Sequence, residues 1–541
     1  MDPAWLLPTA PLFPLMLAAL ATIPRLRKPL FDCLPLAPLP ALLLPFLLPV
    51  GTRIDLPHTL LQASWELDDI GRLFQLFTAA AWAFASLMTV ATFRHNPRRG
   101  SFLLPFLTAM SGNLVLPTAA DAVTYYSGFA VMSFASWGLV IHSGTPEARK
   151  AGRIYLTLVV LGELLIFPAL VKGALWSGSA QMSSLQTHWA LDPNPQLPLL
   201  LIFAGFAIKV GLFPAHFWLP LAHPAAPAPA SAVLSGCMIK AGLLGWIRLL
   251  PLGNFPLPDL ASLVSLLAAV GMIGGLILAL GQQKPKALLA YSSVSKLSAV
   301  TLILAPALRF PDLLPVALTA ALTLAAFHAL HKSALFLGAT LTPEAPRWLT
   351  LPLLLLCASF AGIPGLAGAA TKEPLKTFFA HPALQHAPWI PLLFTLSTLL
   401  TLPVMARFLR LTAPQATPAS PLTPARFIWL LAALFALTGV YFLPAPALIQ
   451  PPTLPQIAKG WLDPALLAGL ALCIPLLRRT PLRAPSFPPG DLLSLFQKLP
   501  RPNLTPALRL IDDLERNTRL APGGFLYILL ILLLVGVLWP G

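Results

Sequence analysis

The stretch Lys209-Val-Gly-Leu-Phe-Pro214-Ala-His216-Phe-Trp218-Leu-Pro220, followed by Gly236-Cys-Met-Ile-Lys240, decides the fold class of this chain. Two lysines stand inside apolar runs, and a proline follows the first of them by five residues. A lone lysine near the centre of a bilayer costs about 2.5–3.5 kcal/mol on insertion scales and usually marks an ion or proton route. Proline removes a backbone hydrogen bond and interrupts a helix. The stretch therefore predicts a broken membrane helix with a functional cation.

The composition of the whole chain agrees with a membrane protein. Its 541 residues are 57% hydrophobic and 10% charged, whereas soluble domains carry about 25% charged residues. Lipid leaves no water to satisfy an open backbone, so we expect an all-α, polytopic transmembrane helical bundle embedded in the lipid bilayer. The net charge of +16 comes from basic residues in short loops, so we expect no nucleic-acid partner. The four cysteines stand singly, and we expect no metal site, no cofactor-binding site and no disulfide framework.

Apolar runs long enough to cross about 30 Å of hydrocarbon predict about sixteen spans. The first of them is expected to be a retained span, because it lacks the features of a cleavable signal peptide. The predicted spans lie near residues 5–23, 30–50, 69–93, 101–118, 121–142, 153–176, 195–218, 228–250, 258–281, 287–307, 311–338, 349–378, 387–409, 427–445, 463–477 and 522–539.

Basic residues gather in alternate loops, after the odd-numbered spans. These loops contain Arg25, Arg27, Lys28, Arg94, Arg98, Arg99, Arg149, Lys150, Arg153, Lys284, Lys286, Arg407, Arg410 and Arg426. The main exceptions in the other loops are Arg53, Arg72, Arg309 and Lys459. By the positive-inside rule the odd loops are cytoplasmic and the N-terminus lies outside. We expect a multi-pass protein of the cell inner (cytoplasmic) membrane.

Two halves of the chain share a pattern that suggests an internal repeat. Each half holds about five spans and a proline-interrupted span with a buried lysine: Lys209 with Pro214, and Lys372 with Pro364. An odd number of spans inverts the second copy, and paired interrupted helices point to a transport site. The predicted domains are 1–100, N-terminal transmembrane helices; 101–250, first inverted repeat; 251–410, second inverted repeat; 411–477, C-terminal transmembrane helices; 478–521, cytoplasmic amphipathic linker; and 522–541, final transmembrane helix.

Four separated motifs, in order over roughly residues 70–410, resemble the antiporter-like subunits of respiratory complex I, membrane-bound hydrogenases and Mrp-type cation/proton antiporters. The likeness is closer to the hydrogenase and Mrp branches. The motifs are Lys209 with Pro214-Ala-His216-Phe-Trp218-Leu-Pro220 and Met238-Ile-Lys240; Lys286-Ala-Leu-Leu-Ala-Tyr291-Ser-Ser-Val-Ser; Phe327-His328-Ala-Leu-His331-Lys332-Ser; and Gly362-Ile-Pro364-Gly with Lys372-Glu373.

The resemblance implies a fourteen-helix core with two inverted five-helix repeats that contain broken helices, plus extra C-terminal helices. Each repeat forms a half-channel in such proteins, and protons move along a central axis of lysines and histidines. The matching positions here are Lys209, Lys240, His328, Lys332 and Lys372. His331 lies three residues after His328 on the same helix face, so it is a further candidate for the axis.

The chain departs from the family pattern at one position. Ala130 stands where the family usually has a glutamate that pairs with the first lysine. We expect Glu163, in the next span, to supply the counter-charge to Lys209, because an unpaired charge at that depth is costly. The alternative is that the first half-channel is weakened or has another role. Lys296 is also unusual and is a candidate proton stop or counter-charge in the second repeat.

Three other ionisable residues have two interpretations each. Asp121 is either a carboxylate at a channel mouth or a cap for the span that begins there. His216 and His223 flank a tryptophan near a span end, so we expect interfacial or loop-stabilising roles rather than membership of the axis.

These features predict a proton-translocating, antiporter-like subunit of a larger inner-membrane complex, coupled to a redox partner or to an ion gradient. The chain has no redox-cofactor ligand set, so any oxidoreductase activity would belong to partner subunits. The expected partners are other membrane subunits, protons and, in one alternative, Na⁺. The alternatives are a component of an Mrp-type Na⁺/H⁺ antiporter and a diverged, non-conducting scaffold or energy-coupling component. A general solute carrier fits least.

Overall fold

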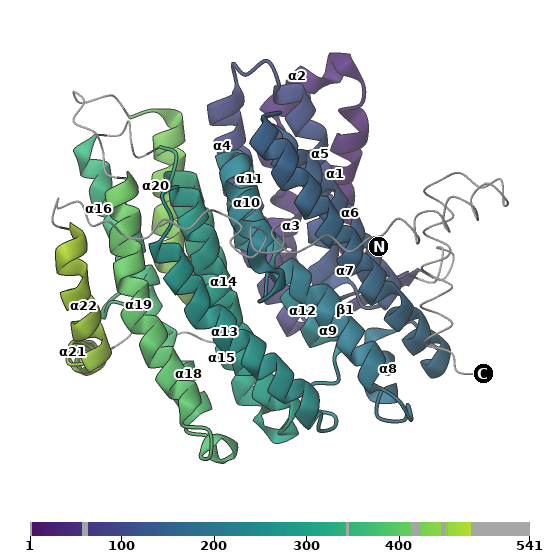
Figure 1. Ribbon diagram of the computed structural model, residues 1–541. Helices are drawn as coiled ribbons and strands as arrows, with labels where there is room; N and C mark the ends of the chain where they lie inside the picture. Colours follow the sequence, from purple (N-terminus) through teal and green to yellow (C-terminus); the bar gives the residue numbers. More distant parts are fainter. Residues whose placement is uncertain are drawn as a thin grey trace, which may run out of the picture.

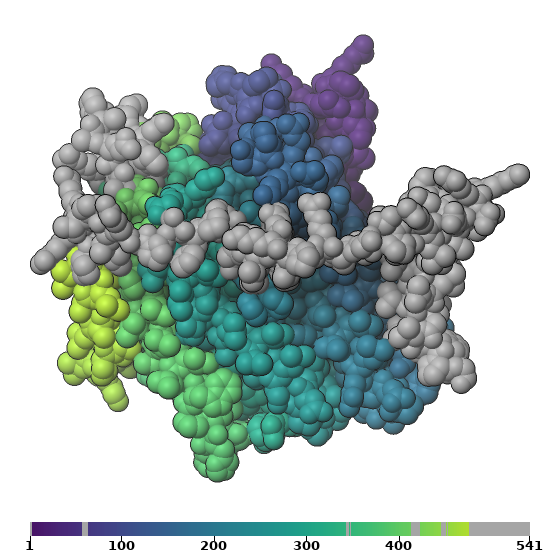
Figure 2. Space-filling view, in the orientation of Figure 1, coloured from purple at the N-terminus to yellow at the C-terminus, as the bar shows by residue number. Residues whose placement is uncertain are grey.

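The computed structural model describes residues 3–56, 63–341, 346–412, 422–444, 451 and 453–477. Most helices stand side by side with roughly common axes, with the N-terminal helices on one side of the bundle and α22 on the other (Figure 1). The space-filling view shows the same order across a closely packed face (Figure 2). The predicted all-α, polytopic bundle is confirmed. The predicted linker 478–521 and final helix 522–541 lie outside the described residues.

The described chain forms the following helices and strands. They are α1 (Thr9–Leu20), α2 (Arg27–Asp32), α3 (Leu39–Leu47), β1 (Thr52–Leu56), β2 (Ala63–Leu67), α4 (Asp69–Phe93), α5 (Arg99–Val115), α6 (Ala122–Ile141), α7 (Pro146–Ser177), α8 (Met182–His188), α9 (Gln196–Val210), α10 (Trp218–Ala225), α11 (Ala228–Val233), α12 (Lys240–Leu249), α13 (Pro258–Leu280), α14 (Pro285–Leu304), α15 (Leu314–Gly338), α16 (Thr350–Phe360), α17 (Ala367–Ala370), α18 (Lys372–Phe379), α19 (Trp389–Thr412), α20 (Pro424–Thr438), α21 (Leu454–Trp461) and α22 (Pro464–Leu477).

The described residues contain 11 helices long and apolar enough to cross a membrane, or up to 13 if each of two bent pairs is one span. The bent pairs are Pro24–Asp32 with Leu34–Leu47, and Leu454–Trp461 with Pro464–Ile474. The sequence predicted about sixteen spans, of which 522–539 lies outside the described residues. The structure divides residues 349–378 into α16, α17 and α18 around Pro364, where the sequence predicted an interrupted span.

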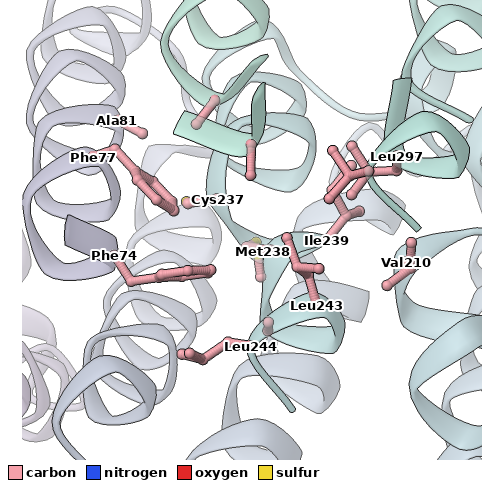
Figure 3. Packing of buried hydrophobic residues seen from close by; sticks show 14 of the residues in the cluster. Phe74, Phe77, Ala81, Val210, Cys237, Met238, Ile239, Leu243, Leu244 and Leu297 are labelled. Carbon is pink, nitrogen blue, oxygen red and sulfur yellow. The ribbon is translucent and has the colours of Figure 1, made fainter. Parts of the chain in front are cut away.

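Two spans form the centre of the bundle. The segment Ala228–Leu249 is 100% buried and Pro285–Leu308 is 94% buried. The first of these spans is α11, a π-helical turn at Leu234–Met238, and α12. Figure 3 shows Phe74 and Phe77 of α4 on one side of this turn and Leu297 of α14 on the other. Lipid-facing helices therefore enclose a protein-lined interior.

The helix interruptions lie at the two prolines named from the sequence. Helix α9 ends at Val210, Gly211 adopts a left-handed φ of +75°, and α10 begins after Pro214. Helix α16 ends at Phe360, and Gly362 (φ +81°) and Gly365 (φ +88°) flank Pro364. Glycine adopts this conformation without a steric penalty, so the chain turns sharply beside a lysine at both places. Whether the two halves form inverted repeats stays a prediction.

A small antiparallel hairpin, β1–β2, adds one element to the helical bundle, with Ile54 opposite Trp65. It leads into Asp68, which caps α4 by accepting from the backbone N–H of Gly71 at 2.7 Å. Asp68 also accepts from the two terminal guanidinium nitrogens of Arg248 on α12. Burial by itself raises the pKa of Asp68, but the charge and hydrogen bonds of Arg248 outweigh burial and hold that pKa below its usual value. This ion pair ties the N-terminal third of the chain to the central span.

Close packing of α5 on α6 gives a test of the fold. A Cβ at Gly112 would lie 2.4 Å from the backbone nitrogen of Met132 and 2.6 Å from the carbonyl oxygen of Gly128, whereas a Cβ at Gly274 of α13 would meet nothing within 4 Å. We expect Gly112→Ala to destabilise the protein by about 1–3 kcal/mol through overpacking. Gly274→Ala should be neutral or slightly stabilising, because alanine favours helix. Thermal unfolding in one detergent measures both, and equal melting temperatures would contradict the packing.

Candidate functional site

Lys209 lies at the end of α9, beside the first helix interruption, and its side chain is only 4% exposed. Its Nζ donates to Ser133 Oγ at 3.0 Å and to Tyr155 OH at 3.1 Å. It also lies 5.8 Å from the ring centre of Phe129. A cavity of about 10 Å³ adjoins these groups, which is about the space for one water molecule. Hydroxyls and aromatic faces thus surround the ammonium group.

Glu163 of α7 is buried on the neighbouring helix, 1% exposed. Helices α7 and α9 approach closely where both have glycine, since a Cβ at Gly205 would lie 2.8 Å from the carbonyl oxygen of Gly162. This approach brings Glu163 within electrostatic range of Lys209. The two groups do not form an ion pair shorter than 4.0 Å in the described structure. Ala130 of α6 is half-buried and contributes no charge.

Lys240 begins α12, directly after the π-helical turn, and is fully buried. Its Nζ donates to the carbonyl oxygen of Ser235 at 2.5 Å. A π-helical turn widens the helix and is frequently found at functional sites. The hydroxyl of Ser235 lies 2.9 Å from the hydroxyl of Ser293 on α14. The two central spans are therefore joined by hydrogen bonds at the level of this lysine.

Helix α15 contributes the next three candidates, all buried. Lys332 Nζ donates to the carbonyl oxygen of Leu289 at 2.7 Å and to Ser292 Oγ at 2.5 Å, both on α14. The adjacent hydroxyls of Ser292 and Ser293 thus contact Lys332 on one side and Ser235 on the other. A hydroxyl both donates and accepts, so these serines connect the surroundings of two buried lysines. The sequence showed the Tyr-Ser-Ser motif but not this role.

The two histidines of α15 differ in their surroundings. His331 Nε2 is 2.9 Å from Ser359 Oγ, and the backbone N–H of Gly368 donates to the same oxygen at 3.2 Å. His331 therefore stabilises the second helix interruption through Ser359. Neither ring nitrogen of His328 has a hydrogen-bond partner in the described part of the chain. Both ring nitrogens of His328 are therefore open among the described residues, whereas those of His331 are engaged.

Phe360, at the last residue of α16, separates this centre from a second cavity. Its ring centre lies 4.6 Å from Lys332 Nζ and 5.6 Å from Lys296 Nζ, and the ring of His328 is 6.0 Å away. The face of an aromatic ring attracts a cation. The cavity beyond it, about 50 Å³, is lined by Lys296 and Lys372, and it has room for a few water molecules.

Lys372, the first residue of α18, differs from the other lysines because it has an acidic partner. Its Nζ lies 3.3 Å from Asp463 Oδ2, which precedes α22. The side chains are 28% and 35% exposed, respectively. Asp463 was not a candidate from the sequence, because 91 residues separate it from Lys372 and it stands alone in a C-terminal apolar region.

Electrostatic interactions link four of the candidate lysines. Lys332 interacts with Lys240 and Lys296, and Lys296 interacts with Lys372. Lys209 and Lys240 are both within electrostatic range of the buried thiol of Cys237. The structure thus brings together residues from α9, α12, α14, α15 and α18.

Three further ionisable residues from the sequence analysis are Asp121, His216 and His223. Asp121 is buried and accepts from the backbone N–H groups of Ser64, Val123 and Thr124, so it caps α6 and holds the hairpin. His216 and His223 are both buried between helices and at most 2% exposed, and their interfacial or loop-stabilising roles stay a prediction. His223 stacks on Phe336 at 4.4 Å, within range of the charges on Lys240 and Lys332. In the described ranges, no three His, Cys, Asp or Glu side chains are arranged to hold a metal ion.

Sequence comparison identifies the class to which this bundle belongs. Residues 119–401 match the family described as NADH:quinone oxidoreductase/Mrp antiporter, transmembrane, and the chain belongs to that family. The matched region includes Lys209, Lys240, Lys332 and Lys372. It is an integral, multi-pass membrane protein.

Particular relatives come from several kinds of membrane complex. The chain is 31% identical to hydrogenase-4 component B of Escherichia coli, covering 58% of this chain and 51% of the relative. It is 30% identical to a protein of Rhizobium meliloti described as a probable K⁺/H⁺ antiporter subunit, over 62% of this chain and 34% of the relative. It is 25% identical to F420H2 dehydrogenase subunit N of Methanosarcina mazei, over 65% of this chain and 76% of the relative. The chain spans about half the length of the first of these relatives.

Two solved structures share the fold. The Mrp complex from Dietzia sp. superposes with a TM-score of 0.71 at 22% identity, covering 98% of this chain and 63% of that chain. The membrane-bound sulfane sulfur reductase, an archaeal respiratory membrane complex, gives a TM-score of 0.68 at 18% identity. The superposition covers 88% of this chain and 100% of that chain. At these identities the likeness is one of fold.

Buried cations with and without acidic partners should respond differently to replacement. Arg248→Met leaves Asp68 without its partner, so we expect a loss of about 1.5–3 kcal/mol. Lys240→Met removes an ammonium group that is not ion-paired in the described structure, so stability should be unchanged or higher. Thermal unfolding of both variants in the same detergent checks this. A larger loss for Lys240→Met than for Arg248→Met would mean that Lys240 has a structural role.

Proposed function

We propose that this chain is a proton-translocating, antiporter-like subunit of a larger inner-membrane complex. Protons pass along the buried series Lys209, Lys240, His328, Lys332 and Lys372, with Lys296 as an added member of the second half. The single observation that carries the proposal is the run of contacts from Lys240 to Lys372. Ser235, Ser293 and Ser292 connect the surroundings of Lys240 and Lys332. Lys332 and Lys296 both lie against Phe360, and Lys296 shares a cavity with Lys372. Family membership and relatives from hydrogenase and antiporter complexes support it.

The physical basis is the high energy of a charge in the interior of the bundle. A buried ammonium group without a carboxylate partner is held only by hydroxyls, carbonyls and aromatic faces, so its charged and neutral forms are close enough in free energy to interchange. Each protonation then changes the field at the next lysine, since these sites titrate together. Charge therefore moves along the series in steps. A proton on one lysine disfavours protonation of the next lysine until one of the protons leaves.

Coupling to a redox partner or to an ion gradient would come from outside this chain. In our proposal the other membrane subunits of the complex impose charge changes at one end of the series, and the bilayer encloses the rest. We place the N-terminus outside the cell membrane on the charge pattern of the loops. Cation/proton exchange of the Mrp type, with Na⁺ as the cation, is the second candidate, because the matched family includes Mrp antiporters and one relative is described as a probable K⁺/H⁺ antiporter subunit.

The central prediction concerns Lys332. In membrane vesicles that contain the native complex, we expect Lys332→Met to reduce proton flux driven by a K⁺ diffusion potential by roughly 100-fold or more. The physical reason is that methionine fills the same space without a titratable group. A pH-sensitive dye inside the vesicles measures the flux. Lys376→Met is the matched control, since Lys376 is 63% exposed and pairs with Glu373 on the surface.

Wild-type flux in Lys332→Met vesicles would favour a non-conducting scaffold instead. Replacing Na⁺ with choline in the same assay distinguishes the second candidate. A flux that requires Na⁺ on the opposite side would identify exchange, whereas a flux indifferent to Na⁺ supports proton conduction alone.

Glu163 gives a separate test of the first half of the chain. If its carboxylate replaces the charge missing at Ala130, Glu163→Gln should slow proton flux by roughly tenfold or more, because Lys209 loses the carboxylate that favours its charged form. Glu147→Gln, at the exposed start of the same helix, is the control and should behave as the wild type. An unaltered rate in Glu163→Gln would remove Glu163 from the route.

A further inference from the structure

The ion pair between Lys372 and Asp463 joins two interrupted helices that lie far apart in the sequence. Lys372 follows the interruption at Pro364, and Asp463 stands between α21 and α22, whose axes are bent by 56°. The interruptions pack against each other, since a Cβ at Gly460 would lie 3.0 Å from Pro364. Two breaks in contact, each with one member of an ion pair, form a built site rather than a chance surface contact.

The carboxylate of Asp463 is fixed in orientation. Its Oδ1 accepts from the backbone N–H of Ala465 at 3.0 Å, which leaves Oδ2 directed at Lys372 Nζ. A carboxylate needs only one oxygen to cap a helix start, so the other is available for proton exchange. The part-exposed pair lies at one end of the series, whereas Lys240 and Lys332 are fully buried.

On its other side, Lys372 lines the cavity that it shares with Lys296. Its Cε lies 3.6 Å from the position that a Cβ on Gly362 would occupy, so the lysine stem lies across the turn of the broken helix. The charges of Lys296 and Lys372 repel each other. Lys372 is therefore placed between a repelling ammonium group and an attracting carboxylate.

We propose that Asp463 is the proton-exchanging carboxylate at the outer end of the series, a role that rests on the proposed function. The N–H bond of the Lys372 ammonium breaks as an O–H bond forms on Asp463, leaving a neutral amine and a neutral carboxylic acid. The acid then releases its proton to water on the exposed side, and Lys372 takes another from the cavity. Charging Lys296 drives the transfer by repulsion, and the reverse sequence operates when the gradient is reversed.

The chain offers a matched control for this carboxylate. Asp192 has the same arrangement, with Oδ1 accepting from the backbone N–H of Asn194 at 2.9 Å and Oδ2 2.9 Å from Lys172 Nζ. This second pair is not part of the lysine series. Asparagine retains an oxygen that can cap the backbone, so Asp463→Asn and Asp192→Asn each remove the ionisable group and keep the cap.

The test measures proton flux, as above, in vesicles that contain the complete complex. We expect Asp463→Asn to reduce the flux by roughly tenfold or more, Asp463→Glu to restore most of it, and Asp192→Asn to leave it unchanged. A wild-type rate in Asp463→Asn, or an equal loss in Asp192→Asn, would overturn the proposal.

A second measurement tests the geometry without activity. A water-soluble carbodiimide joins a lysine amine to a touching carboxylate as an amide, with the lost water taken up as the urea. Mass spectrometry should find the Lys372–Asp463 cross-link in the wild type, and its absence alongside a Lys172–Asp192 cross-link would overturn the pairing. If Lys332→Met abolishes flux and Asp463→Asn does not, only the role of Asp463 fails. If neither variant alters flux, the proposed function fails first.

Discussion

The interior of this protein depends on how charged amines are accommodated where water and carboxylates are scarce. Lys209, Lys240 and Lys332 are buried, and each donates to hydroxyl or carbonyl oxygens of neighbouring residues. A buried charge without such partners is prohibitively costly. The π-helical turn offers a carbonyl oxygen to Lys240, α14 offers a carbonyl and a hydroxyl oxygen to Lys332, and hydroxyls of α6 and α7 accept from Lys209.

The same requirement explains which ionic groups stabilise the fold. Arg248 and Asp68 form a bidentate contact that joins the hairpin and α4 to the central span. Asp121 accepts from backbone N–H groups at the start of α6. The proposed proton movement instead uses lysines held by neutral oxygens, together with Lys372, whose carboxylate partner is part-exposed.

The second half of the chain is the more completely built of the two. Phe360 faces Lys332, Lys296 and His328, and a cavity leads from it to Lys372. The first half has a smaller cavity, and its buried carboxylate, Glu163, lies on α7. Close approach of α7 and α9 at two glycines brings Glu163 within electrostatic range of Lys209.

Much of this protein followed from local sequence properties. Low charge and long apolar runs predicted the helical membrane bundle, and prolines beside lysines predicted where helices break, because span length and backbone hydrogen bonding are local constraints. The sequence also named the buried lysines of α9, α12 and α15. It did not reveal that His216 and His223 are buried between helices, since hydropathy does not report such burial. Only the tertiary structure decided which groups meet: Asp463 with Lys372, Ser292 with Lys332 and Asp68 with Arg248. These contacts join residues 40 to 180 positions apart, and such pairings depend on helix packing that no local pattern specifies.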